Sequence, residues 1–353
     1  MTSSAIKLYN SKISGRKAGQ PLASAVRQFQ KELQGWYERA GRHDLPWRHT
    51  DSAYAILVSE MMLQQTQVET VLQRFYHPFL KRFPTLSSLA NASLQEVMEE
   101  WQGLGYYRRA KFLHQAAQRS APKLPSDFDG LIALPGIGKN TAHAVLALAY
   151  RKPYPVMEAN VKRVLCRIFA METANEKQLW EHAFSLLDKG NPFDYNQAMM
   201  DLGAMICKPK APKCERCPAS NICQGKGAPE RYPTPKAKKK IPIRKQQIVA
   251  IEDLQGRIYM TPRDGEFLHG LFQFVEIDAG SDAMQLNDEL YSKQNWQYIG
   301  EVEQTYSHFK QQAEVYRLSY KGQHRPSHWY LPVDIKKLPL SKKEQKILAL
   351  IKV

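Results

Sequence analysis

The segment 134–164 constrains the chain more than any other. It opens with the turn LPGIG at 134–138, in which Gly136 and Gly138 permit backbone conformations closed to other residues and leave the main chain bare. The small, apolar residues of 141–150 follow at once and predict a helix whose first N–H groups are free to bind an anion such as a DNA phosphate. Because an ordinary glycine turn between two core helices has the same pattern, the turn alone does not decide the function.

A single carboxylate stands at a fixed distance beyond this turn. Glu158 precedes Asn160 and the basic, apolar segment 161–169, which predicts a second helix. A turn that binds phosphate, followed by an acid held in register with it, is the arrangement expected of an enzyme that acts on a nucleotide within DNA. The remainder of the chain must supply the support for that interpretation.

The charge of the chain indicates a polyanionic partner. The net charge is +16 and the pI about 9.5, which favours nucleic acid or an anionic membrane surface. The membrane is not supported, because no apolar run approaches the roughly 18 residues of a spanning helix and no signal-peptide core is found near the N-terminus. Four of the five cysteines crowd into 207–223, which predicts a reducing, intracellular compartment rather than a disulfide framework.

Composition and periodicity divide the chain into four parts. Residues 1–24 form a basic segment without acids, expected to be a flexible tail, with a transit peptide left open. Residues 25–230 show helical periodicity almost throughout and predict an all-α domain. Residues 231–245 carry seven Lys/Arg and three Pro and predict a linker, and residues 246–353 contain alternating segments that predict a small α+β domain.

Four cysteines predict a metal centre. They follow the spacing C-x6-C-x2-C-x5-C and are Cys207, Cys214, Cys217 and Cys223. Four thiolates in so short a stretch can wrap one centre, but a zinc site and a cubane iron–sulfur cluster both need four cysteines, so the spacing does not choose between them. Lysine and arginine residues within this loop indicate a surface that also contacts DNA. Cys166 lies alone in an apolar helical pattern and is expected in the core.

From about residue 25 to the C-terminus the chain resembles the MutY-type adenine DNA glycosylase family of the helix-hairpin-helix superfamily. The resemblance rests on specific motifs, namely LPWR at 45–48, SEMMLQQTQV at 59–68, GLGYYRRA at 103–110, LPGIGKNTA at 134–142, ANVKRVL at 159–165, NQAMMDLGAMIC at 196–207 and the cysteine spacing. It implies that the cysteines hold a [4Fe–4S] cluster and that the chain is a monomeric glycosylase removing adenine mispaired with 8-oxoguanine or guanine in double-stranded DNA.

The resemblance also assigns roles to individual residues. Glu60 matches the general acid that protonates the leaving adenine, and an apolar setting among Met61, Met62 and Leu63 would raise its pKa. Gln65 and Tyr106 match side chains that wedge into the duplex when the base is extruded, and Trp47 and Arg48 match the walls of the adenine pocket. The complete set expected to contact DNA is Trp47, Arg48, Gln65, Thr66, Tyr106, Gly136, Gly138, Lys139, Asn140, Asn160, Ser307 and His308.

The chain departs from the family at three positions near the predicted site. The second catalytic carboxylate of the family is an aspartate, whereas here Glu158 is longer by one methylene and displaces the carboxylate by roughly 1 Å, which can cost about 10²-fold in rate. Asn140 stands where relatives carry Ser or Tyr, and His143 where they carry Gly. No lysine occupies position 140, so no Schiff base is expected and the enzyme is predicted to be monofunctional.

These departures leave two alternatives open. One is a lesion-binding homologue whose excision is impaired by Glu158, Asn140 and His143. The other is a glycosylase whose base choice is altered because His143 changes the hairpin or the pocket wall. A panel of mismatches would separate them.

The C-terminal part from about residue 246 resembles the Nudix-like domain that the family uses to recognise 8-oxoguanine. The catalytic Nudix pattern is absent, so hydrolysis of a pyrophosphate is not expected. Ser307 and His308 match the recognition element, where a hydroxyl and an imidazole can bond the altered base edge or a phosphate. The implied location is the nucleoid in a bacterium, or the nucleus or mitochondrion in a eukaryote, with no membrane partner.

Overall fold

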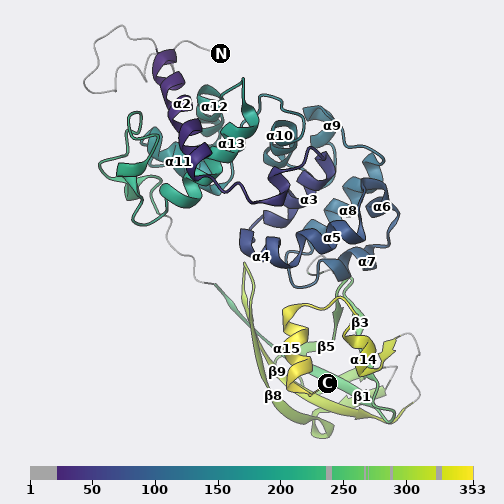
Figure 1. Ribbon diagram of the computed structural model, residues 1–353. Helices are drawn as coiled ribbons and strands as arrows, with labels where there is room; N and C mark the ends of the chain where they lie inside the picture. Colours follow the sequence, from purple (N-terminus) through teal and green to yellow (C-terminus); the bar gives the residue numbers. More distant parts are fainter. Residues whose placement is uncertain are drawn as a thin grey trace. The chain divides into compact units, whose positions relative to one another are not determined.

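The computed structural model describes residues 22–235, 241–265, 268, 270–286, 289–322 and 328–352 (Figure 1). The tail expected over 1–24 and the linker expected over 231–245 therefore lie partly outside the described residues. None of the described helices is long and apolar enough to cross a membrane. By contact the chain divides into two compact units, 1–68 with 119–237 and 69–118 with 238–353. The domain boundaries expected from the sequence remain a prediction.

The first unit is helical. Its α-helices are α2 (Leu22–Ala40), α3 (Ala53–Leu63), α9 (Phe128–Ile132), α10 (Lys139–Leu148), α11 (Ala159–Ile168), α12 (Glu176–Leu186) and α13 (Pro192–Asp201). A π-helical turn, η2 (Leu202–Ile206), continues α13. The unit also contains the short 3-10 helices η1 (Pro46–Arg48), η3 (Cys214–Arg216) and η4 (Pro229–Arg231). Helices α9 and α10 with the turn between them form the hairpin that LPGIG predicts.

The main core of this unit joins α2, α11, α12 and α13. Apolar side chains of α2, among them Phe29 and Leu33, recur at helical spacing and are almost fully buried. A smaller cluster of Ile56, Ala144, Leu148 and Val156 joins α3 to α10. The small residues of α10 allow this close approach, and α3 carries Glu60.

The second unit combines short helices with a sheet. The helices are α4 (Val68–Arg74), α5 (Tyr76–Arg82), α6 (Leu86–Asn91), α7 (Leu94–Glu100), α8 (Arg108–Ser120), α14 (Pro332–Ile335) and α15 (Lys342–Leu350). Ser93 caps the start of α7 and forms a capping box with Glu96.

The sheet is built around two long strands, β1 (Ile243–Asp253) and β9 (Lys310–Tyr320), which pair in parallel. The order is β10-β2-β1-β9-β8, and β5 also pairs with β1. The flanking strands are β2 (Ile258–Tyr259), β5 (Val275–Asp278), β8 (Gln297–Thr305) and β10 (Trp329–Tyr330), while β3 (Thr261–Pro262) pairs with β4 (Phe272–Gln273) and β6 (Ala283–Leu286) with β7 (Glu289–Ser292).

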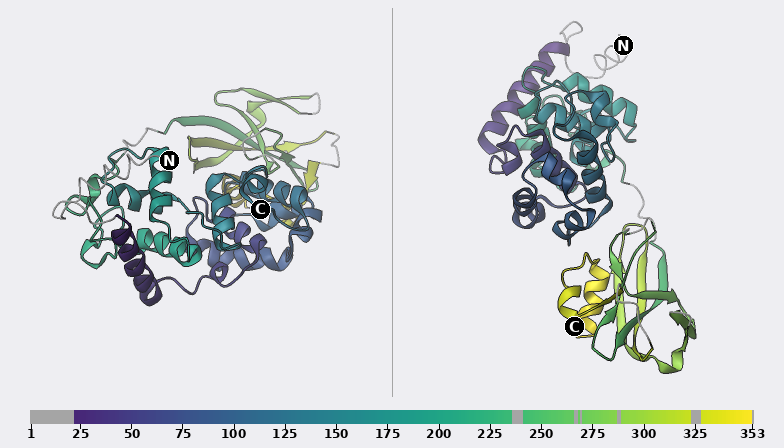
Figure 2. Two further views of the ribbon diagram at one scale, coloured as in Figure 1. Left: turned by 90° about the horizontal axis from the view of Figure 1, so that it is seen from above. Right: turned by 90° about the vertical axis from the view of Figure 1, so that its right-hand side faces the viewer.

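Both faces of this sheet are covered. Alternate residues of β1 enter different cores, Ile248 and Ala250 on one face and Val249 and Ile251 on the other. Helices α14 and α15 lie on the same side of the sheet (Figure 2), and α15 contributes Ile347 to the core on that face. The predicted fold, a mainly α helix-hairpin-helix domain followed by a smaller domain containing a sheet, is confirmed.

Candidate active site and cysteine pocket

Glu60 lies near the end of a helix that is otherwise almost completely buried. Ser52 caps α3 by accepting from the N–H of Ala55 at 3.2 Å. Met61 and Met62 are buried beside Glu60, as the sequence predicts, and burial raises the pKa of Glu60 to about 8, with a further contribution from the charge of Glu158. The carboxyl of Glu60 therefore keeps its proton at neutral pH.

Glu158 is the residue that immediately precedes α11, and its backbone is extended. Its Oε1 accepts a hydrogen bond from Asn160 Nδ2 at 3.0 Å. Burial raises the pKa of Glu158, while that hydrogen bond and the charges of Arg42 and Arg163 oppose the rise. The charge of Glu158 acts on Glu60, so the two carboxyls share one electrostatic environment in the first unit, and the charges of Arg42 and Arg163 act on Glu158.

The segment that leads to Glu158 is held by side chains. Asn196 of α13 accepts from Val156 N at 2.7 Å, and Asn140 of α10 accepts from Met157 N at 2.6 Å. Sequence reasoning missed Asn196, although its place in NQAMMDLGAMIC was the available signal. The expected DNA contact at Asn140 is untested, and its Oδ1 atom is already bonded inside the protein.

Arg48 is buried in an ion pair with Asp201. Its two terminal nitrogens each donate to one carboxylate oxygen of Asp201 at 2.8 Å, and Arg42 reaches the same carboxylate with its Nε at 2.7 Å. These contacts hold the pKa of Asp201 below its usual range despite burial. Within the described part of the chain, the Nε–H of Arg48 is buried without an acceptor. Trp47 is also buried. Sequence reasoning did not single out Asp201.

Two residues expected to enter the duplex have left-handed backbone. Gln65 has φ 57° and lies exposed just after α3, and Tyr106 has φ 50° with 46% of its surface exposed. Such conformations are uncommon for residues other than glycine and are found most often at functional sites. Thr66 donates to Gln64 O at 3.4 Å in the same turn as Gln65.

The hairpin turn is built as predicted. Gly136 has φ 73°, and Gly138, the residue before α10, has open space where a Cβ would stand. Lys139 lies with its Nζ 4.3 Å from the centre of the Trp180 ring, so its ammonium group is directed to an aromatic face.

His143 belongs to the core of the first unit. It is buried, and its ring contacts those of Phe128, Tyr154, Trp180 and Phe184. Burial lowers the pKa of His143 to about 4, which keeps the ring neutral. Its Nδ1 lies 2.9 Å from the carbonyl oxygen of Pro155, two residues before Met157.

In the second unit, the loop 306–309 reverses the chain between β8 and β9. The N–H of Tyr306 donates to Phe309 O at 2.8 Å, which leaves Ser307 and His308 exposed at the tip. The hydroxyl groups of Tyr106 and Ser307 are 2.9 Å apart. A residue expected to wedge into the duplex and a residue expected to recognise the altered base are therefore in contact within this unit.

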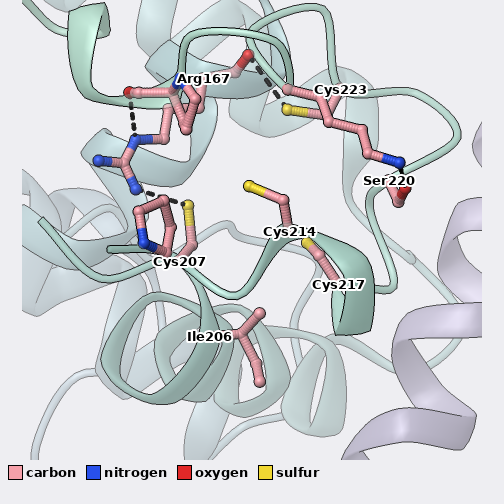
Figure 3. A pocket seen from close by; sticks show the side chains of 10 residues that line it. Arg167, Ile206, Cys207, Cys214, Cys217, Ser220 and Cys223 are labelled. Atoms are coloured by element: carbon pink, nitrogen blue, oxygen red, sulfur yellow. Dashed lines mark hydrogen bonds between the residues drawn. The ribbon is translucent and has the colours of Figure 1, made fainter. Parts of the chain in front are cut away.

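The four cysteines line one pocket, together with Arg167 and Ile206, and the pocket is partly open to solvent (Figure 3). Burial raises the pKa of Cys217 to about 12 and that of Cys223 to about 11, so these thiols need a cationic partner to act as thiolates at neutral pH. Across the described residues, no three His, Cys, Asp or Glu side chains are grouped as a site for one metal ion. The donor set is nevertheless the one that a tetrathiolate centre requires.

Arg167, which sequence reasoning missed, holds the edge of this pocket. It is buried, donates to Cys207 Sγ at 3.3 Å and to Lys208 O at 2.6 Å, and its own carbonyl accepts from Cys223 Sγ at 3.4 Å. Arg163, one helical turn earlier, donates to Cys207 O at 2.8 Å and to Asn160 Oδ1 at 2.9 Å. The i, i+4 spacing of two arginines before the cysteines was the available signal.

Comparison with known proteins agrees with this geometry. Residues 58–189 match the family described as HhH-GPD superfamily base excision DNA repair protein. The chain is 32% identical to the adenine DNA glycosylase of Homo sapiens over 375 residues, covering 84% of this chain and 68% of that protein. It is 34% identical to the adenine DNA glycosylase of Buchnera aphidicola subsp. Acyrthosiphon pisum over 267 residues, covering 72% and 76% of the two chains.

Solved structures share the helical part. A thermostable thymine-DNA glycosylase is 30% identical, with a TM-score of 0.54, over 58% of this chain and 98% of that one. A non-covalent endonuclease III–DNA complex is 18% identical, with a TM-score of 0.50, over 59% and 98% of the two chains. At 18% identity, the similarity to the endonuclease III structure shows a shared fold and nothing more.

Proposed function

Since the chain belongs to the adenine DNA glycosylase family, MutY type, within the helix-hairpin-helix base-excision superfamily, we propose that it removes adenine paired with 8-oxoguanine or guanine in duplex DNA, with Glu60 as the general acid. The chain is an N-glycosylase, and its relatives support excision of adenine. The observation that carries the assignment of Glu60 is its raised pKa of about 8 beside a second carboxyl.

The two glutamates divide the chemistry. Breaking the N-glycosidic bond requires a proton on the leaving base and stabilisation of an oxocarbenium-like sugar. Glu60 retains a proton to donate, because its carboxyl is desolvated and lies in the field of Glu158. Glu158 has Arg42 and Arg163, whose charges oppose the rise that burial causes in its pKa, and we assign to it the negative charge that stabilises the sugar.

The geometry of Arg48, Gln65 and Tyr106 supports the roles that we propose for them in the adenine pocket and as wedge residues. The buried Nε–H of Arg48, which has no acceptor in the described residues, is available to the extruded base. Gln65 and Tyr106 project from strained, exposed turns and are suited to fill the gap that the base leaves. The basic net charge and the hairpin with Gly136 and Gly138 favour contact with the phosphate backbone.

The cysteine pocket suits a [4Fe–4S] cluster. Cys207, Cys214, Cys217 and Cys223 would hold it, and a polynuclear cluster fits thiols that surround a pocket without forming a site for one ion. When bound, such a cluster supplies structural rigidity to the basic loop 207–223. The chain's own part is to anchor that loop through Arg163 and Arg167.

A single-turnover excision assay on duplex DNA with 8-oxoguanine opposite adenine tests this function. We expect the natural chain to excise adenine, Glu60→Gln to lose at least about 10²-fold in rate, and Glu181→Gln, an exposed glutamate of α12, to match the natural chain. If only Glu158→Asp excises adenine, while all variants bind the mismatch equally tightly, the natural chain is instead a lesion-binding protein. A mismatch panel tests an altered base choice.

A further inference from the structure

The segment that delivers Glu158 is extended but is no part of a sheet in the described residues. Its backbone groups are bonded instead by side chains of two helices. From α13, Asn196 accepts from Val156 N and donates through Nδ2 to Tyr154 O at 2.9 Å. Buried backbone groups left without partners cost roughly 1–3 kcal/mol each, so such side chains fix the path of the chain.

The other contacts come from α10. Asn140 Oδ1 accepts from Met157 N at 2.6 Å, and His143 Nδ1 donates to Pro155 O at 2.9 Å, since a carbonyl oxygen can only accept. Asn140 and His143 are three residues apart and so share one face of the helix. That face runs alongside the segment and acts as its hydrogen-bonding partner.

The bond from Met157 is the one nearest to the carboxylate. Met157 is buried and immediately precedes Glu158, whose carbonyl accepts from Lys162 N at 2.8 Å as the first bond of α11. Asn140 therefore fixes the Val156–Met157 peptide, one residue before Glu158, and the first helical bond fixes the peptide that follows Glu158. Removing the Asn140 acceptor would release one of these two constraints.

We propose that Asn140 is a positioning residue for Glu158, holding the Val156–Met157 peptide so that the longer glutamate side chain presents its carboxylate to the sugar. This rests on the proposed function. Positions 140, 143 and 158, the three departures from the family near the site, are then one physical unit. Asn140 and His143 bond the segment at whose end Glu158 stands.

Excision rates test the proposal. In single-turnover excision of adenine, Asn140→Ala is expected to lose about 10- to 100-fold in rate, the scale of a 1 Å misplacement, with less than about threefold change in mismatch Kd. Asn140→Asp, which keeps an oxygen acceptor of the same reach, should recover most of the rate. In a Glu158→Gln background, Asn140→Ala should cost less than about threefold, because residues that act through one another are not additive.

A second readout separates this inference from the proposed function. Hydrogen exchange at the Met157 amide should be faster in Asn140→Ala, whether or not the natural chain excises adenine. Asn175→Ala is the matched control, because Asn175 accepts from Gln178 N at 3.1 Å at the start of α12 and lies outside the site. It should leave the excision rate and Met157 exchange unchanged.

Each opposing outcome overturns the positioning role of Asn140. Unchanged exchange at Met157 would show that its acceptor does not hold the peptide. An equal loss of rate in the natural and Glu158→Gln backgrounds would show that Asn140 acts independently of Glu158. A change in mismatch Kd that accounts for the whole effect would make Asn140 a DNA contact.

A different outcome would overturn the proposed function alone and leave the positioning role standing. It is failure of the natural chain to excise adenine, combined with faster Met157 exchange in Asn140→Ala.

Discussion

At the scale of single residues, the environment gives two glutamates different chemistry. Glu60 lies beside the buried Met61 and Met62, and burial is the main cause of its raised pKa, whereas Glu158 has Asn160 as a donor and arginine charges nearby. Both carboxyls are desolvated, and the field of Glu158 falls on Glu60. The difference in partners, rather than in residue type, favours a proton on Glu60 and a charge on Glu158.

The raised pKa of Glu60 makes a prediction for stability. Its pKa is about 8 in the folded chain and 4.5 ordinarily, so the folded state binds this proton more tightly than the unfolded state. The stabilisation is complete below pH 4.5 and is lost as the pH rises through about 8. Glu60→Gln, which cannot ionise, should therefore gain stability relative to the natural chain between pH 5 and pH 9.

Thermal melting at several pH values measures this effect. We expect the Tm difference between Glu60→Gln and the natural chain to grow by more than about 2–4 °C over that interval, because a pKa shift of this size is worth several kcal/mol and about 1 kcal/mol alone moves the Tm of a chain of 150–250 residues by about 2–4 °C. Glu181→Gln should show no such trend. A difference that stays constant with pH would mean that Glu60 ionises normally in the folded chain.

At the scale of elements, α11 connects the two sites of the first unit. Glu158 stands at the beginning of the helix, and Arg167, near its end, bonds the cysteine loop through Cys207 Sγ and the carbonyls of Lys208 and Pro209. An arginine can make all these bonds because its planar guanidinium carries five donors. A lysine has the charge but not that geometry.

Loss of Arg167 should therefore weaken retention of the cluster that we propose. We expect Arg167→Ala to lower the iron content per chain at least about twofold after purification, with Arg167→Lys intermediate, because hydrogen bonds to the side chains that hold a metal typically contribute about 10- to 100-fold to its affinity. Iron and sulfide analysis measures this directly. Lys162→Ala, on the same helix in a surface pair with Glu176, is the control, and iron content that is equal in all variants would exclude this role.

At the scale of the whole molecule, the second unit brings together residues that are distant in the sequence. Tyr106 follows the short helices and Ser307 lies in the loop between β8 and β9, yet their hydroxyls are 2.9 Å apart. The strained backbone of Tyr106 and the tight turn at 306–309 hold these groups in place. The hydrogen bond with Tyr106 therefore restricts the position of the Ser307 hydroxyl within the unit.

We predict that Ser307→Ala reduces discrimination between lesions. Removing a hydroxyl that bonds the altered base edge should lower the preference for 8-oxoguanine:adenine over guanine:adenine by about tenfold, since one such contact is worth roughly 1–3 kcal/mol. Excision rates on both duplexes give the ratio. Ser281→Ala, which changes a turn elsewhere in the second unit, should retain the preference of the natural chain for 8-oxoguanine:adenine. A rate that falls equally on both duplexes would remove Ser307 from recognition.

The sequence alone determined the class of fold and the chemistry of the groups. Helical periodicity, the glycine turn at 134–138, the alternating strands and the cysteine spacing are local patterns, and the helices, the hairpin and the sheet are confirmed. Glu60, Glu158 and the four cysteines could be proposed as site residues because motifs record which residue types the chemistry needs.

Only the tertiary structure decided how those groups are held. Asp201 beneath Arg48, Arg167 against Cys207 Sγ, and Asn140 on Met157 N are contacts between segments far apart in the chain. No local pattern encodes them, because a hydrogen bond between distant segments depends on how the helices pack. The same packing desolvates Glu60, and so the raised pKa expected from its apolar neighbours depends on the whole folded unit.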